Sequence, residues 1–256
     1  MSFDRLIRKI VETKNPTVVG LDPKLEYIPE ELKAEAYAKY GKTLEGAAEA
    51  ILLFNKGIID AICDVVPAVK PQCAYYERFG WQGMKALAET IAYAKEKGMF
   101  VITDGKRNDI GSTMTAYAVA HLGEVEVEGE VFTPFGGDAL TVNGYLGTDG
   151  IAPLTELCSK KDAGIFVLVK TSNPSSRRAA GPQPGGPSSL RRHGRDVRKV
   201  GRELHGRAGL LGSGRCGRCH LSRAAGRNAQ GHAAHLPAGS RLWSPGWRCQ
   251  GCHRCL

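Results

Sequence analysis

The sequence predicts an α/β protein of the (β/α)8 barrel class (a TIM barrel), in which only the first five strands are recognisable. Short apolar, β-branched runs alternate with amphipathic helical stretches, as in a parallel sheet covered by helices. These runs end in polar residues, and active sites of barrels lie at the carboxyl ends of their strands. A doubly wound sheet is the alternative, but the first run is followed by Leu21-Asp22-Pro23-Lys24 and not by a glycine-rich phosphate loop.

Each expected element follows from its own residue pattern. The expected strands are apolar runs bounded by turn or polar residues, at 17–23, 68–72, 100–104, 138–144 and 164–172. The expected helices have apolar residues three to four positions apart, at 4–13, 43–63, 81–97, 112–122 and 148–158. Thr43 is a suitable N-cap for the second helix, and Gly98 follows the third as a C-terminal glycine does.

The composition changes abruptly after Ser176. Residues 1–176 hold 19 basic and 24 acidic side chains, a net charge of −5, whereas residues 177–256 hold 16 and 2, a net charge of +14. The second part is rich in Arg and Gly and has no Ile, Phe or Tyr. We therefore expect two units, with 1–176 the N-terminal part of a barrel and 177–256 a poorly ordered tail.

Nothing in the sequence indicates export or insertion into a membrane. No apolar run approaches the roughly 18–20 residues of a membrane span. The N-terminal residues alternate charged with apolar side chains and do not resemble a signal peptide. A cytoplasmic protein with reduced thiols and no membrane partner is the expectation.

The strongest functional signal is the stretch 100–110, FVITDGKRNDI, where a strand leads into three charges. Asp104 and Lys106 are two residues apart, so on an extended strand end their side chains leave the same face. Asp109 follows where the chain turns into the next helix. A charged cluster at a strand end costs free energy if it is buried without use, which favours a catalytic role. A salt bridge that only caps the strand is the other interpretation, and spacing alone does not decide between them.

These residues and their surroundings resemble the orotidine 5′-phosphate decarboxylase family, in particular its long bacterial branch. The similar segments are VVGLDP, AVKPQCAYYERFG, VITDGKRNDIGST, LTVNGYLG and VLVKTSNPSS, all within residues 1–176. Asp104-x-Lys106-x-x-Asp109 is the specific part. The resemblance implies a carbon–carbon lyase that converts the nucleotide orotidine 5′-phosphate to UMP and CO2 in pyrimidine biosynthesis, with no metal or other cofactor.

The chemistry of that reaction suits the motif. Loss of CO2 leaves an electron pair on an sp2 carbon, so the protein must supply a fixed cation and then a proton. Lys106 suits both tasks, because an ammonium is a compact charge that can also give up a proton. By resemblance, Asp104 lies near the substrate carboxylate and holds Lys106, Lys70 extends the alternating charges towards the ribose, and Asp22 accepts ribose hydroxyls.

The resemblance also implies a homodimer. Asp109, with Ile110 and Thr113 after it, belongs to the segment that the family inserts into the active site of the neighbouring subunit. Asn143 and Ser172 are further candidates for substrate binding, with Ser172 expected near the pyrimidine.

Several of these candidates have an alternative, structural interpretation. Asp22 precedes Pro23 and can be a turn acid, and Asn143 next to Gly144 is a common turn pair. Lys70 can be a solvated strand end, and Ser172 can belong to a turn.

Residues 177–256 contain motifs of a different class. Cys216-x-x-Cys219 and Cys249-x-x-Cys252, with His220 near the first pair, have the spacing of a zinc ribbon. The charge of +14 is typical of an arm that binds nucleic acid. The alternative function is therefore a barrel body fused to a zinc- or RNA-binding module.

The tail is better explained as an out-of-frame translation, which would leave it with no nucleic-acid partner. Residues 209–220, GLLGSGRCGRCH, can be encoded so that reading one base later gives GYSGVGAVVGA, similar to the sixth strand of the family. The same one-base shift converts the stretch from His235 into TFLPGHGYGAQGGGAK, similar to its phosphate-side loop. It also converts RRAAG at 177–181 into GELQ, the family's continuation of SNPSS. We therefore expect the chain as written to have little or no activity.

Overall fold

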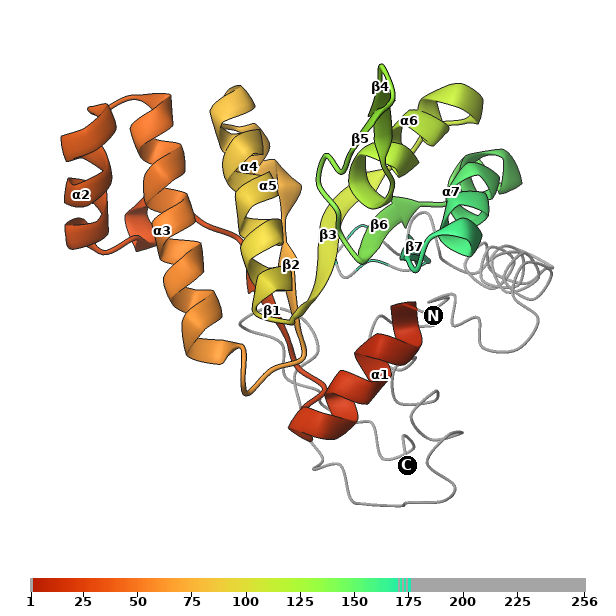
Figure 1. Cartoon of the computed structure of the whole chain (residues 1–256), viewed down its shortest axis with the longest axis horizontal. Coiled ribbons are helices and arrows are strands. Elements are labelled where there is room, and N and C mark those ends of the chain that lie inside the picture. Colours follow the sequence, from red (N-terminus) through yellow and green to blue (C-terminus); the bar gives the residue numbers. More distant parts are fainter. Residues whose placement is uncertain (1, 170, 172, 174, 176–256) are drawn as a thin grey trace.

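The computed structural model describes residues 2–169, 171, 173 and 175, which form a parallel sheet with helices packed against it (Figure 1). The five strands of this sheet are β1 (Val18–Leu21), β2 (Ala68–Pro71), β3 (Phe100–Arg107), β6 (Ala139–Asn143) and β7 (Gly164–Leu168). They lie in the order β1-β2-β3-β6-β7, and every pair is parallel. Each strand is thus next to its predecessor in the sequence, apart from a separate hairpin, as in a barrel. The five expected strands are confirmed, and within the described residues the sheet is open.

Each of the five expected helices is present. The helices are α1 (Ser2–Thr13), α2 (Glu30–Tyr40), α3 (Leu44–Ile62), α4 (Cys73–Glu77), α5 (Gly80–Glu96), α6 (Gly111–Leu122) and α7 (Thr148–Lys160), with a short 3-10 turn η1 (Leu25–Tyr27). Two helices were not expected: α2, which lies between β1 and α3, and α4, which follows β2 directly. Helix α2 has no apolar stripe that would have revealed it, since Ala36 is its single buried residue. The α4 helix has only one turn and a half, too short for a periodic pattern.

Local signals fix the helix ends where the sequence places them. The Oγ1 atom of Thr43 accepts a hydrogen bond from the N–H of Gly46 at 3.1 Å, so Thr43 is the N-cap of α3. Helix α5 ends at Glu96, and Gly98 has a φ angle of +72°, which glycine adopts at little cost. The end of α5 therefore lies directly before β3, which begins at Phe100.

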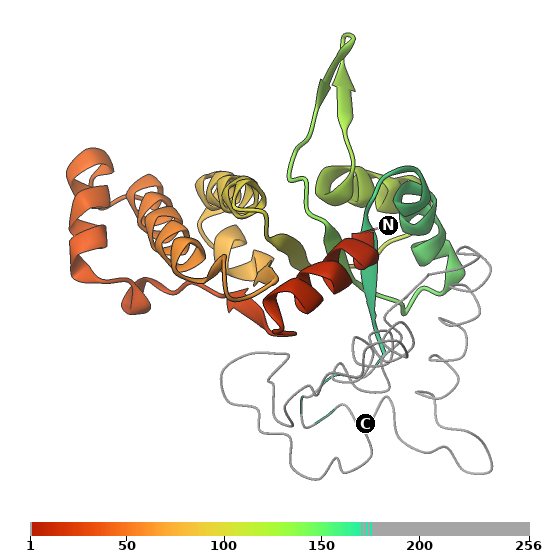
Figure 2. The same ribbon diagram turned by 60° about the horizontal axis from the view of Figure 1, so that its bottom comes forward.

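The two faces of the sheet are buried against different helices. Val69 and Val101 pack in a core with α3 and α5, whereas their neighbours Ala68 and Phe100 pack on the opposite face against α1. A third core joins β6 and β7 to α6 and α7. Figure 2 shows α1 lying across the strands on the face away from α3 and α5. The alternation of side chains along β2 and β3 therefore decides which helix each residue meets.

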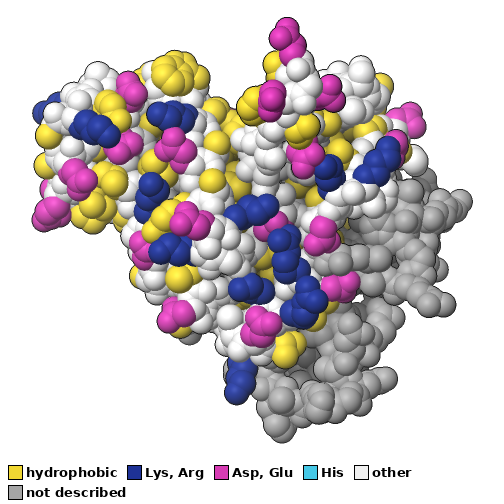
Figure 3. Space-filling model, viewed as in Figure 1, with side chains coloured by type: hydrophobic (Ala, Val, Ile, Leu, Met, Phe, Trp, Pro, Cys, Tyr) yellow, Lys and Arg dark blue, Asp and Glu magenta, His cyan; other side chains and the backbone are white. Residues whose placement is uncertain are grey.

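A small antiparallel hairpin stands apart from the sheet. It consists of β4 (Val125–Val127) and β5 (Glu130–Phe132), with Val125 opposite Phe132 and Val127 opposite Glu130. The hairpin projects beyond α6 in Figure 2, and acidic and apolar side chains mingle on it in Figure 3. All of its strand residues are exposed. Its glutamates protect the exposed edges against pairing with another strand.

Among the described residues, no helix combines the length and the apolar character that a membrane crossing requires.

Candidate active site

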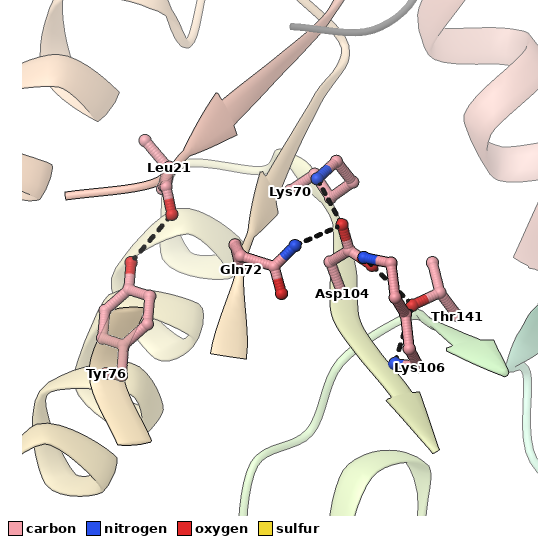
Figure 4. Close-up of polar contacts among 7 residues, drawn as sticks. All are labelled: Leu21, Lys70, Gln72, Tyr76, Asp104, Lys106 and Thr141. Carbon is pink, nitrogen blue, oxygen red and sulfur yellow. Dashed lines mark hydrogen bonds and ion pairs between the residues drawn. The ribbon is translucent and has the colours of Figure 1, made fainter. Parts of the chain in front are cut away.

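Asp104 is the centre of the candidate site, at the carboxyl end of β3. Its Oδ2 atom accepts a hydrogen bond from Lys70 Nζ at 2.6 Å, and its Oδ1 atom accepts one from Lys106 Nζ at 2.7 Å (Figure 4). The side chains of Asp104 and Lys70 are 6% and 10% exposed, whereas that of Lys106 is 47% exposed. The structure therefore brings these three predicted residues together, with one lysine inside and one open to solvent.

Two neutral side chains complete the contacts of the Asp104 carboxylate. Thr141 Oγ1 donates to Oδ1 at 2.7 Å, and Gln72 Nε2 donates to Oδ2 at 3.0 Å. Burial raises the pKa of Asp104, but the charge of Lys70 and the hydrogen bonds from the two lysines and Thr141 outweigh it, so the pKa is lowered. Asp104 is therefore an anion at neutral pH.

Gln72 and Thr141 were not among the residues predicted from the sequence. Gln72 lies two residues after Lys70, directly after β2, and Thr141 lies on β6, which pairs with β3. Side chains two apart at a strand end share a face, and parallel neighbours end at the same edge. That geometry is the signal that could have indicated both residues, once the strand order was known.

The backbone at Lys106 differs from the extended strand that the spacing predicts. Its φ angle is +47°, and the pairing of β3 with β6 shifts register between Thr103 and Arg107. The N–H of Lys106 donates to Thr141 Oγ1 at 3.1 Å instead of to a strand carbonyl. The predicted ion pair with Asp104 is thus present, but it depends on a β-bulge and not on the regular alternation of side chains along a strand.

Asp22 lies at the same edge of the sheet, directly after β1. Leu21 is paired with Pro71, and the carbonyl oxygen of Leu21 accepts from the N–H of Gln72 at 3.1 Å, so the end of β1 adjoins that of β2. The Asp22 residue is exposed. Desolvation raises its pKa, and the charges of Lys70 and Lys106 oppose that effect. Its position fits either a substrate ligand or a turn acid.

Asp109, Ile110 and Thr113 lie at the start of α6, away from the contacts of Asp104. The Asp109 carboxylate accepts from the N–H of Ile110 at 2.8 Å. Ile110 is 50% exposed, and Thr113 is also exposed. Among the described residues, no ion pair joins Asp109 to Lys70 or Lys106. The role of this segment across a subunit interface stays a prediction.

Of the two weaker candidates, the one that the structure describes does not contact the cluster. Asn143, at the end of β6, is exposed, and its Oδ1 atom accepts from the N–H of Tyr145 at 3.0 Å, which is turn chemistry. Ser172 lies outside the described residues, as do the Cys and His motifs and the whole segment 177–256. Within the part of the chain that is described, no group of three His, Cys, Asp or Glu residues could hold a metal ion.

The fold and the site together define a class of protein. A sheet with the strand order of a barrel carries, at its carboxyl edge, a buried carboxylate between an internal and an exposed ammonium group. That arrangement is typical of barrel enzymes whose polar residues act at this edge.

Comparison with known proteins identifies the family within that class. The model of the orotidine 5′-phosphate decarboxylase / HUMPS family matches residues 33–200, so the chain belongs to this family. An orotidine 5′-phosphate decarboxylase of Rhodopirellula baltica is 50% identical over 165 residues, which are 64% of this chain and 53% of that protein. One of Caldicellulosiruptor saccharolyticus is 40% identical over 173 residues, 68% of this chain and 57% of that protein. The chain thus spans about half the length of the curated relatives it matches.

A solved structure agrees with this assignment. The OMP decarboxylase of Leishmania donovani superimposes with a TM-score of 0.61 at 26% sequence identity, covering 79% of this chain and 67% of that one. The expected barrel-type α/β fold is confirmed, with five of its strands formed by the described residues.

Proposed function

We propose that residues 1–176 carry the catalytic part of an orotidine 5′-phosphate decarboxylase, which forms UMP and CO2 in pyrimidine biosynthesis without a cofactor. The observation that carries the proposal is the Asp104 carboxylate held between Lys70 and Lys106 at the carboxyl edge of the sheet. A biosynthetic reaction of this kind supports a cytoplasmic location.

In the proposed mechanism, Lys106 acts on the carbon that loses CO2. The bond between C6 of the pyrimidine and its carboxylate breaks, CO2 departs, and the electron pair stays on C6. The Lys106 ammonium stabilises this developing charge and then transfers a proton from Nζ to C6, which leaves a neutral amine that solvent reprotonates. Its 47% exposure supports this role, because the ammonium can meet a ligand while Asp104 holds it from behind.

Asp104 has two effects in this mechanism. Its hydrogen bonds fix the direction of the Lys106 ammonium, so the cation needs little reorganisation when charge develops. Its lowered pKa keeps it anionic, so it repels a carboxylate bound beside it, and that repulsion ends as neutral CO2 leaves.

The remaining candidates would bind the nucleotide. Lys70 and Asp22, at neighbouring strand ends, would contact the ribose, while Asn143 and Ser172 would lie near the base. In a homodimer, the exposed segment at Asp109 would enter the site of the second copy.

We also propose that residues 177–256 are a translation in the wrong frame and not a second module. The support is the sequence itself, because one shift of a single base restores three separate family-like stretches after codon 176. The nucleotide sequence around codons 174–180 tests this directly. A gene that reads the tail in frame, together with stoichiometric zinc in the purified protein, would favour the alternative module.

The test of the activity uses two chains with identical residues 1–176. One has the printed tail, and the other, the frame-restored chain, continues in the shifted frame. We expect the frame-restored chain to convert orotidine 5′-phosphate to UMP and the printed chain to show little or no turnover.

Lys106→Ala should reduce turnover by many orders of magnitude and leave UMP binding measurable. Lys85→Ala, on the exposed face of α5, is the control and should leave turnover unchanged. Near-normal turnover of Lys106→Ala would refute the assignment.

A further inference from the structure

The peptide bond between Gly105 and Lys106 is held by side chains at both ends. Its carbonyl oxygen accepts from Arg107 Nη1 at 3.3 Å, and its N–H donates to Thr141 Oγ1 at 3.1 Å. The same Thr141 hydroxyl donates to Asp104 Oδ1, which also accepts from the Lys106 ammonium. The backbone and the ammonium of Lys106 therefore belong to one connected set of hydrogen bonds.

Lys106 requires such support because its backbone is strained. Its φ angle of +47° is in the left-handed region, which costs a residue with a Cβ atom about 1–2 kcal/mol. Such a conformation persists only where the surroundings determine it from several sides. A peptide free to relax would turn the Lys106 side chain away from Asp104.

Arg107 connects this peptide to two helices. Its Nη2 atom pairs with the carboxylate of Glu77 on α4, and its Nε atom donates to Nε2 of His121 on α6 at 3.3 Å. The guanidinium carbon lies 5.5 Å from the centre of the Tyr117 ring, also on α6. Burial, with the nearby Arg107 charge, lowers the pKa of His121 to about 4, so the imidazole is neutral at pH 7 and can accept this hydrogen bond.

We propose that Arg107 is a positioning residue, which braces the Gly105–Lys106 peptide against α4 and α6 and so keeps the Lys106 ammonium beside Asp104. A lysine could not replace it, because one ammonium cannot reach the Gly105 carbonyl, Glu77 and His121 in the geometry that the planar guanidinium provides. The consequence for turnover rests on the proposed function, whereas the structural role does not.

The first test measures amide hydrogen exchange in the printed full chain and needs no activity. In Arg107→Lys, the Lys106 amide should exchange at least about tenfold faster than in the wild type, as expected when a local hydrogen bond opens. The Val101 amide, which donates to Asp138 at 2.8 Å at the other end of β3, should keep its rate. Arg78→Lys, at an exposed arginine next to Glu77, is the matched control and should change neither rate. An unchanged Lys106 rate, or an equal acceleration at Val101, would overturn the proposal.

The second test measures kinetics in whichever of the two chains above turns over orotidine 5′-phosphate. Arg107→Lys should lower kcat by roughly 10- to 100-fold and change KM by less than about threefold, because a misplaced Lys106 weakens contacts made in the transition state. An unchanged kcat, or an effect on KM alone, contradicts the proposed consequence for turnover. If neither chain turns over, the proposed function fails, and the exchange rates still decide whether Arg107 braces the peptide.

Discussion

Two buried aspartates lie at opposite ends of the sheet, and each is flanked by two cations. Asp104 lies in the carboxyl-terminal half of β3 and accepts hydrogen bonds from the two lysines of the candidate site. Asp138 precedes β6, and its Oδ1 atom pairs with Arg5 at 2.7 Å and with Lys95 at 3.3 Å. Its other oxygen accepts from the N–H of Val101 at 2.8 Å. The two carboxylates thus have nearly the same kind of partners, and they differ in which elements of the fold those partners connect.

The three partners of the Asp138 carboxylate come from three different elements, so the carboxylate joins α1, α5 and β3 at one point. At Asp104, by contrast, the exposed partner Lys106 comes from the same strand, two residues away, and stands on a strained backbone. Lys106 thus adds little to the connection between elements. This contrast agrees with the general division of barrels, in which the carboxyl face serves chemistry and the amino face serves stability.

The largest expected difference concerns turnover. Lys106→Ala and Arg5→Ala both remove a partly exposed cation from a buried aspartate, with exposures of 47% and 38%. In the frame-restored chain, Lys106→Ala should abolish UMP formation and change the free energy of unfolding by less than about 1 kcal/mol. Arg5→Ala should lower stability by about 1–2 kcal/mol and leave kcat unchanged. UMP formation and urea unfolding, measured on both variants, check the pair, and loss of turnover in Arg5→Ala would break the comparison.

Removing the charge of each aspartate gives a second contrast, in stability. Asp104→Asn removes the buried negative charge that faces Lys70, whose side chain is 10% exposed, and should cost about 3 kcal/mol. Asp138→Asn should cost about 1–2 kcal/mol, since Arg5 and Lys95 are both 38% exposed and can turn to water. Urea unfolding at neutral pH measures both values. Equal losses of unfolding free energy in the two variants would contradict the proposed difference between the two ends of the sheet.

The buried imidazole of His121, near the end of α6, should also make the fold sensitive to mild acid. Its folded pKa of about 4 lies below its ordinary value of 6.5, so the unfolded chain takes up a proton first as the pH falls. Stability should therefore be complete above pH 6.5, decline by roughly 3 kcal/mol between pH 6.5 and 4, and lose no more from this group below that range. His121→Gln, which keeps an acceptor for Arg107, should remove this part of the decline in urea unfolding measured across the range. An identical pH profile in the variant would contradict the prediction.

Much of the fold was accessible to sequence reasoning because its strands are uninterrupted apolar runs that end in polar residues. The contacts around Asp104 were accessible only in part. Lys70 and Lys106 stand out as charges next to apolar strands, whereas Gln72 and Thr141 are ordinary polar residues whose role depends on which strands are neighbours. The bulge at Lys106 was not predictable, because left-handed backbone at a lysine follows from tertiary contacts and not from local preference.

The smallest expected effect sharpens the account of that bulge. In Lys106→Gly the left-handed conformation carries no Cβ penalty, whereas Lys106→Ala retains it. The glycine variant should therefore be more stable than the alanine variant by about 1 kcal/mol, although both lack the ammonium. Thermal unfolding of the two variants side by side checks this difference. A less stable glycine variant would show that the backbone at position 106 is not strained.

The order of the strands has a consequence for synthesis of the protein. Because each strand pairs with its predecessor in the chain, β1, β2, β3 and β6 can assemble in the sequence in which they leave the ribosome. Lys70, Asp104, Lys106 and Thr141 all lie within the first 143 residues. Every residue of the charged cluster is therefore synthesised before translation reaches codon 176, whichever reading frame follows.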